Sequence, residues 1–171
     1  MSSRTSAAEL ARTFDARFAA APPEAAGPVE RLLVVGVGEA RAAIRLRDLA
    51  GLFAAPKIAR VPDGAPGLLG IAGVRGRVVP VFDLAALADR VMATRGPAYL
   101  AIAAGLAPVG LLFRGAIDYV EVPGAEVDDA RHLLRGEVHL AGAARVAGAL
   151  VRLLDVPGIT AEIAARAEAS P

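Results

Sequence analysis

The residues that most often carry out catalysis are few in this chain and widely spaced. Its serines stand only at positions 2, 3, 6 and 170, it has no cysteine, and its histidines are His132 and His139. A nucleophile needs a base within hydrogen-bond reach, and the two histidines lie in a polar stretch without the spacing of a zinc motif. We therefore expect no catalytic residues and no histidine-based metal site, and we interpret both histidines as exposed loop residues.

The carboxylates show no pattern of a metal or cofactor site either. Glu126, Asp128 and Asp129 lie together, but no calcium-loop spacing follows them, so a solvated acidic loop is the ordinary interpretation. Asp83 and Asp155 each follow an apolar run, where an aspartate usually caps the next helix or turn. The sequence GVGEAR at 36–41 lacks the third glycine of a dinucleotide-binding loop. We expect no metal and no cofactor.

One arginine stands apart because it interrupts an apolar stretch. Residues 65–84 read APGLLGIAGVRGRVVPVFDL, in which Arg75 and Arg77 flank Gly76. Gly76 permits a tight turn that would point Arg75 outward, and a guanidinium offers five donors in one plane to the carboxylates or carbonyls of a partner. The alternative is an ion pair within the same domain, with Asp63 or Asp83. The residues alone leave both interpretations open.

Composition narrows the classes of partner. The chain has 171 residues, a net charge of +1, 4% aromatic residues and neither asparagine nor glutamine, so it has little to attract nucleic acid or to read base edges. No apolar run approaches the ~18 residues of a membrane span, and the N-terminus lacks the apolar core of a secretory signal. We expect a cytoplasmic protein with no nucleic-acid partner and no direct membrane insertion.

The first 28 residues are predicted to form an N-terminal helix and a proline-rich linker. Ser6 and Glu9 have capping-box spacing, and Leu10, Phe14 and Phe18 then form one apolar stripe. The sequence APPEAAGP at 21–28 is typical of a linker. The stripe either docks on the domain that follows or folds on a partner.

Beyond residue 28 the pattern changes to short β-like runs separated by turn residues, which favours barrels or sandwiches over a parallel sheet. Pro80 indicates an edge strand or a bulge. Two runs end alike, VPVFD at 79–83 and VRLLD at 151–155, which favours two similar small barrels. The predicted strands are 31–37, 40–46, 68–74, 77–83, 98–104, 108–113, 115–122 and 145–155, and the predicted helices are 46–52, 83–91 and 159–170.

The segment at 61–84 resembles the signature of the chemotaxis coupling protein (CheW) family. That family shows G-hydrophobic-x-N-L-R-G, then two hydrophobic residues, proline and a closing D-L. Weaker similarity runs from residue 31 to 154, including 109–122, and 150–159 resembles the closing strand and helix. The positions that match the signature are Gly70, Ile71, Arg75, Gly76, Val78, Val79, Pro80, Val81, Asp83 and Leu84.

The resemblance implies a mostly β fold of two intertwined, five-stranded, SH3-like barrels, with barrel subdomains at about 29–92 and 93–158 inside a domain spanning 29–171. It also implies a non-enzymatic adaptor that links the cytoplasmic tips of chemoreceptors to the regulatory domain of a sensor histidine kinase, at membrane-bound receptor arrays. The implied kinase contacts are Arg75, Gly76, Gly73, Val74 and Gly70, and the implied receptor contacts are Leu49, Gly51, Leu52 and Arg114.

The chain departs from the family pattern at four of these positions. Gly73 and Val74 replace an asparagine and a leucine, Gly51 replaces a glutamate, and Arg114 replaces an aspartate. A lost charge and a reversed charge alter electrostatic matching across an interface. These departures leave open a second function, a decoy that binds the kinase without coupling receptors. A third function that stays open is a β-barrel that binds a small molecule, or an enzyme that uses carboxylates.

Overall fold

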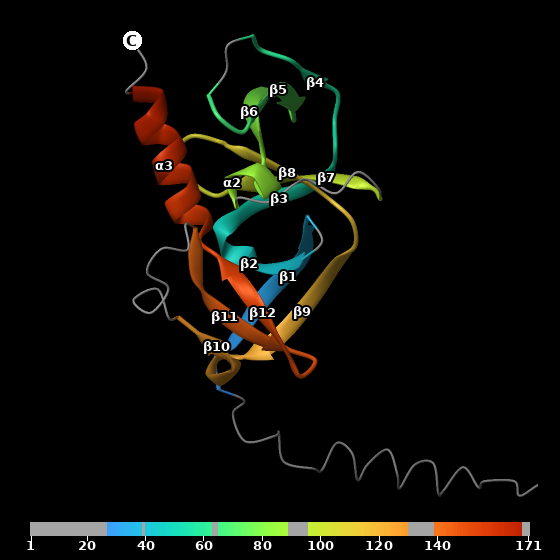
Figure 1. Cartoon of the computed structure of the whole chain (residues 1–171), viewed down its shortest axis with the longest axis vertical. Coiled ribbons are helices and arrows are strands. Elements are labelled where there is room, and N and C mark those ends of the chain that lie inside the picture. Colours follow the sequence, from blue (N-terminus) through green and yellow to red (C-terminus); the bar gives the residue numbers. More distant parts are fainter. Residues whose placement is uncertain (1–26, 39, 63–64, 89–95, 130–138, 169–171) are drawn as a thin grey trace, which may run out of the picture.

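Two β-sheets form most of the part of the protein that the structure describes. The computed structural model describes residues 27–38, 40–62, 65–88, 96–129 and 139–168, and these form two six-stranded sheets with few helices (Figure 1). Each sheet has five strands of five or more residues and one of two residues. In sheet order, the first contains β10 (Val127–Asp128), β11 (Leu140–Val146), β12 (Ala149–Leu154), β2 (Ala40–Arg45), β1 (Val29–Val37) and β9 (Ile117–Pro123). The second contains β3 (Leu49–Ala54), β7 (Ala98–Ala103), β8 (Gly110–Arg114), β6 (Arg77–Asp83), β5 (Leu68–Val74) and β4 (Ile58–Ala59).

The two halves of the chain exchange hairpins. The β1–β2 hairpin lies in the sheet of β9–β12, where β2 pairs in parallel with β12, and the β7–β8 hairpin lies in the sheet of β3–β6, where β8 pairs in parallel with β6. The two sheets have the same strand order, because strands six places apart in the chain take equivalent positions. For example, β1 corresponds to β7, β2 to β8 and β6 to β12. The similar endings at 79–83 and 151–155 thus fall on equivalent strands, β6 and β12.

Three apolar clusters stabilise this arrangement. One lies on the inner side of each sheet, around Leu32 and Leu153 in the first and around Leu100 and Val81 in the second. The third contains side chains of both sheets together with the helices that follow β6 and β12. These are α2 (Leu84–Leu87) and α3 (Val156–Glu168), and the latter runs along the side of the molecule (Figure 1). Burial of apolar surface between the sheets therefore joins the two halves.

The β5–β6 hairpin follows the predicted strand boundaries but not the predicted edge position. Pro80 indicates either an edge strand or a bulge, and because β6 lies between β5 and β8 the edge alternative is wrong, whereas the register shift of the β5–β6 ladder beside Pro80 agrees with the bulge alternative. The pairing of β6 with β8 begins only at Val81. The register shift at Leu68–Gly70 of β5 lies opposite Val81 and Phe82 of β6. Pro80 therefore stands just outside the parallel ladder, where its missing N–H is tolerated.

Three other elements differ from the sequence prediction. The expected helix at 46–52 is a single 3₁₀ turn, Leu46–Asp48, followed by β3, in which half-buried and exposed residues alternate as they do in a strand. The single strand expected at 145–155 is a hairpin that turns at Ala147–Gly148. The terminal helix begins three residues earlier than predicted, at Val156, because Asp155 accepts the Gly158 N–H and proline is tolerated in a first turn.

Some expectations concern residues outside this description. The N-terminal helix with Leu10, Phe14 and Phe18, the subdomain boundary near residue 92, and His132 all lie outside the described residues. Within the described ranges, none of the helices combines the length and the apolar character needed to span a membrane.

Candidate partner-binding site

Arg75 lies at the tip of the β5–β6 hairpin. Val74 pairs with Arg77, so Arg75 and Gly76 form a two-residue turn, and their φ angles are +49° and +76°. Positive φ at both central residues is the requirement of a type I′ turn, whose twist matches that of the flanking strands. The turn expected from Gly76 is present, and Arg75 is exposed.

The structure describes one of the two intramolecular partners considered for Arg75. Asp83, one of the two proposed intramolecular partners, accepts hydrogen bonds from the N–H groups of Ala85 and Ala86 at 2.8 and 3.3 Å and so caps α2. Asp63, the other, lies outside the described residues. Among the residues that are described, no acidic side chain pairs with Arg75.

The five residues implied as kinase contacts do not share one surface. Arg75, Gly76 and Gly73 are exposed. Val74 is half-buried and packs against the inner cluster of the second sheet. Gly70 is buried with φ +142°, and a Cβ there would lie 2.1 Å from the carbonyl oxygen of Ala59. The close approach of β4 therefore accounts for this glycine without any partner.

An apolar face borders the exposed arginine. Gly73 pairs with Val78, and Ile71 pairs with Pro80, on the side of the hairpin away from the buried cluster. Val78 is 70% exposed and Ile71 is 38% exposed. Each side of a strand carries alternate residues, so these side chains lie on one face. The hairpin thus presents a small apolar face with a guanidinium at its tip.

Phe53 of β3 lies beneath that guanidinium. The guanidinium carbon of Arg75 stands 5.1 Å from the centroid of the Phe53 ring, within the range of a cation–π contact. The sequence analysis did not single out Phe53, because nothing local to 49–54 indicates that β3 passes under the β5–β6 turn. We call this contact the Arg75–Phe53 stack.

The four residues implied as receptor contacts lie at two places. Leu49 packs against the cluster between the sheets, Gly51 is half-buried, and Leu52 is 36% exposed. Leu49 pairs with Ala103 of β7, whereas Arg114 pairs with Ala98 at the other end of the same strand. Five residues of a strand span about 17 Å, so the structure does not bring Arg114 next to Leu49.

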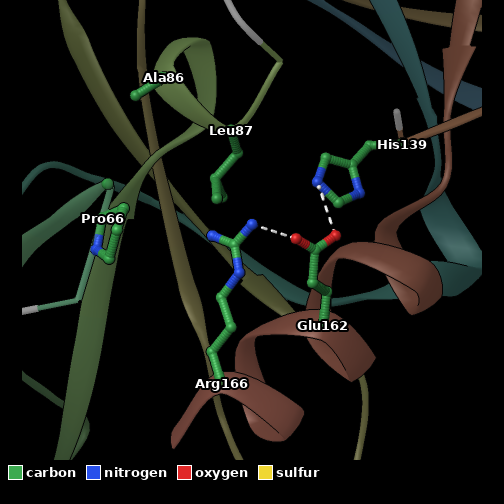
Figure 2. A pocket seen from close by; sticks show the side chains of 7 residues that line it. Pro66, Ala86, Leu87, His139, Glu162 and Arg166 are labelled. Atoms are coloured by element: carbon green, nitrogen blue, oxygen red, sulfur yellow. Dashed lines mark hydrogen bonds and ion pairs between the residues drawn. The ribbon is translucent and has the colours of Figure 1, made fainter. Parts of the chain in front are cut away.

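A pocket of about 400 Å³ lies between α2 and α3 (Figure 2). One side is apolar and the other carries His139, which was expected to be an exposed loop residue. That expectation is wrong, because the His139 side chain is only 7% exposed and its Nε2 lies 3.2 Å from Glu162 Oε2. Glu162 also pairs with Arg166, one turn further along α3. The lining residues are Pro66, Gly67, Ala86, Leu87, His139, Glu162 and Arg166.

Comparison with known proteins identifies the family. The family model described as the CheW-like domain matches residues 31–164. The chain belongs to the CheW-like domain family. It is therefore a non-enzymatic scaffold of chemotactic signal transduction, as the resemblance implied.

A solved structure agrees with this assignment at the level of the fold. The chain is similar to the scaffolding protein TtCheW from Thermoanaerobacter tengcongensis, with a TM-score of 0.65 and 15% sequence identity, over 74% of this chain and 89% of that one. A search of curated proteins found no match. Since the identity is low, the CheW-like fold is shared while the contact residues are free to differ.

Proposed function

We propose that this CheW-like protein is an adaptor that couples chemoreceptors to a sensor histidine kinase, with Arg75 as the contact to the regulatory domain of the kinase. One observation carries the proposal, namely an exposed guanidinium at the tip of a type I′ turn, without a described acidic partner in its own chain. A guanidinium so presented suits carboxylates or carbonyls on another protein.

The family fold supports this adaptor role. Each sheet holds its own apolar cluster, which supports the description of the two sheets, each with strands from both halves of the chain, as small SH3-like barrels. The kinase regulatory domain of such systems is itself built on this fold, and contact between like β modules through strand edges and hairpins is a natural use of them. The proposed location is the cytoplasmic side of membrane-bound receptor arrays.

The kinase contact is tested by reversing the charge of the arginine. Arg75→Glu is expected to abolish binding to the regulatory domain of the chemotaxis histidine kinase from the same organism, measured by calorimetry, and to leave the far-UV circular dichroism spectrum unchanged. The matched control is Arg77→Glu, an equal charge change one residue beyond the turn, which is expected to weaken binding much less. Undiminished binding by the Arg75→Glu protein would remove Arg75 from the site.

A second candidate function is a decoy that binds the kinase but not the receptors. The separation of Arg114 from Leu49 and the inward position of Gly51 favour it, because they leave Leu52 as the exposed member of the β3 group. Kinase activity in a reconstituted mixture of receptor and kinase distinguishes the two functions. Added protein that raises activity supports coupling, and added protein that lowers it supports the decoy.

A further inference from the structure

The Arg75–Phe53 stack joins two parts of the second sheet that do not pair with each other. Phe53 lies in β3, at one end of the strand order, and Arg75 follows β5, which lies next to the other end. The contact therefore bridges the open side of that sheet. It also connects the strand that holds three of the implied receptor residues with the turn that holds the implied kinase contact.

Gly51 provides the space that the aromatic ring occupies. A Cβ built at residue 51 would lie 2.9 Å from Cε2 and 3.1 Å from Cζ of Phe53. The first distance is shorter than real Cβ contacts, so a larger residue at 51 would displace the ring. The family glutamate is thus absent at a position where a side chain would move the aromatic ring from beneath Arg75.

The stack leaves the binding edge of the guanidinium open. The face of an aromatic ring attracts a cation. Phe53 therefore contacts the guanidinium of Arg75 without accepting a hydrogen bond from its N–H groups. The five donors lie in the guanidinium plane and stay available to a carboxylate or carbonyl. A flexible arginine loses side-chain entropy when a partner immobilises it, and a preorganised one loses less.

We infer that Phe53 is a positioning residue for Arg75, and that Gly51 is the residue that allows Phe53 to act in this way. This inference rests on the proposed kinase contact and adds two residues to it. Phe53 holds the guanidinium over β3 before the kinase binds. The glycine that replaces the family glutamate at position 51 thus helps to shape the kinase-binding surface of this protein.

The first test measures coupling between the two side chains. Phe53→Leu is expected to weaken binding of the kinase regulatory domain about three- to fivefold, as the loss of an exposed cation–π contact predicts. Phe53→Tyr, which keeps an aromatic face, is expected to bind within about twofold of the wild type. In an Arg75→Lys background, which keeps the charge and so keeps binding measurable but lacks the planar guanidinium, Phe53→Leu is expected to have a smaller effect than in the wild type. Equal effects of Phe53→Leu in both backgrounds would overturn the inference.

The role of Gly51 is tested in the same way. Gly51→Ala is expected to weaken kinase binding to the same degree as Phe53→Leu, and to add nothing when Phe53→Leu is already present. Urea denaturation of each variant separates loss of binding from loss of folding. A Gly51→Ala protein that is as stable as the wild type and binds the kinase equally well contradicts the role given to this glycine.

A measurement without the kinase separates this inference from the proposed function. In ¹H–¹⁵N spectra, the Arg75 Nε–H is expected to show a ring-current shift that Phe53→Leu removes and Phe53→Tyr retains. If Arg75→Ala leaves kinase binding unchanged while this shift is present, the proposed contact fails and the stack stands. If Arg75→Ala abolishes binding and the shift is absent in the wild type, the stack fails and the contact stands.

Discussion

Arg75 occupies a backbone conformation that arginine does not favour. Its φ is +49°, and the first central position of a type I′ turn is best filled by asparagine or glycine. A side chain with a Cβ in the left-handed region costs about 1–2 kcal/mol. The equivalent turn of the β11–β12 hairpin contains Ala147 and Gly148 with nearly the same φ angles, +48° and +80°. The backbone thus accepts a strained residue in both hairpins, but only one turn carries a charged side chain.

Two glycines of the signature segment have different roles, and substitution by alanine should separate them. Gly70→Ala is expected to destabilise the protein by about 2–4 kcal/mol, because φ is +142° and the new Cβ would collide with the Ala59 carbonyl oxygen of β4. Gly73→Ala, three residues along the same strand, is expected to change the free energy of unfolding by no more than about 0.5 kcal/mol, since nothing lies within 4 Å of its Cβ. Urea denaturation measures both, and a Gly70→Ala protein as stable as Gly73→Ala would show that β4 does not approach β5 closely in solution.

At this scale the sequence allowed the prediction of the arginine turn but not of the contacts beneath it. The pair Arg75-Gly76 between two apolar runs is a local signal, because glycine is the usual second residue of a tight hairpin. Phe53 and His139 acquire their partners from β5–β6 and α3, more than twenty residues away in the chain. No local pattern encodes contacts over such separations.

An exposed cluster of polar side chains lies on the paired strands β1 and β9 of the first sheet. Arg31 and Glu121 are direct cross-strand partners, and the Arg31 Nε donates to Glu121 Oε1 at 3.0 Å. The Tyr119 hydroxyl donates to the same oxygen at 2.6 Å. These interactions, the tyrosine hydrogen bond first, hold the pKa of Glu121 below its usual value, and the pKa of Tyr119 is raised, mainly by the same hydrogen bond.

This cluster gives a pH-dependent prediction at the scale of two strands. A carboxylate whose pKa is lowered by folding stabilises the fold above its unfolded pKa, about 4.3, and this contribution is lost as the pH falls through the lower, folded value. Tyr119→Phe is expected to raise the pKa of Glu121 in a ¹³C titration of the side-chain carboxyl group, because the largest stabilising hydrogen bond is removed. Glu121→Gln is expected to lower the pKa of Tyr119 toward about 10. An unchanged Glu121 pKa in the Tyr119→Phe protein would show that the hydroxyl does not donate to it.

Secondary-structure elements were predictable where turn chemistry is unambiguous. The strands at 68–74 and 77–83 have the predicted bounds, because apolar runs flank a glycine turn. The sequence predicts one strand at 145–155 where the structure has a hairpin turn, since alanine at position 147 is no turn signal. The sequence predicts a later start for α3 because Pro157 and Gly158 are typical helix breakers. The helix nevertheless contains both, since proline is tolerated in a first turn and the Gly158 N–H donates to the Asp155 cap.

At the scale of the whole molecule, the exchange of hairpins is the feature that sequence reasoning alone could not provide. Parallel pairing joins β2 to β12 and β6 to β8, and in the first case the partners are about a hundred residues apart. Hydrophobic periodicity shows which residues of a strand are buried, but not which distant strand lies beside it. The intertwined topology came into the prediction only through the family resemblance.

The exchange predicts that neither half of the protein folds alone. Residues 1–92 contain β1 and β2, whose parallel neighbour β12 and antiparallel neighbour β9 are both in the other half, and residues 93–171 contain β7 and β8, whose neighbours β3 and β6 are both in the first half. Each isolated half would leave four strands without one of their partners and would expose one face of the cluster between the sheets. Each fragment is therefore expected to give the poorly dispersed ¹H–¹⁵N spectrum of an unfolded chain, and an equimolar mixture is expected to recover the dispersion of the intact protein. A control cut within the β7–β8 connection, after residue 106, keeps the β3–β7 pairing inside one fragment and divides the β7–β8 pairing instead, so four pairings again lie between the fragments and each fragment is again expected to be unfolded alone. A dispersed spectrum from either fragment alone would mean that each half folds as an independent barrel, and that pairing between the halves follows folding instead of causing it.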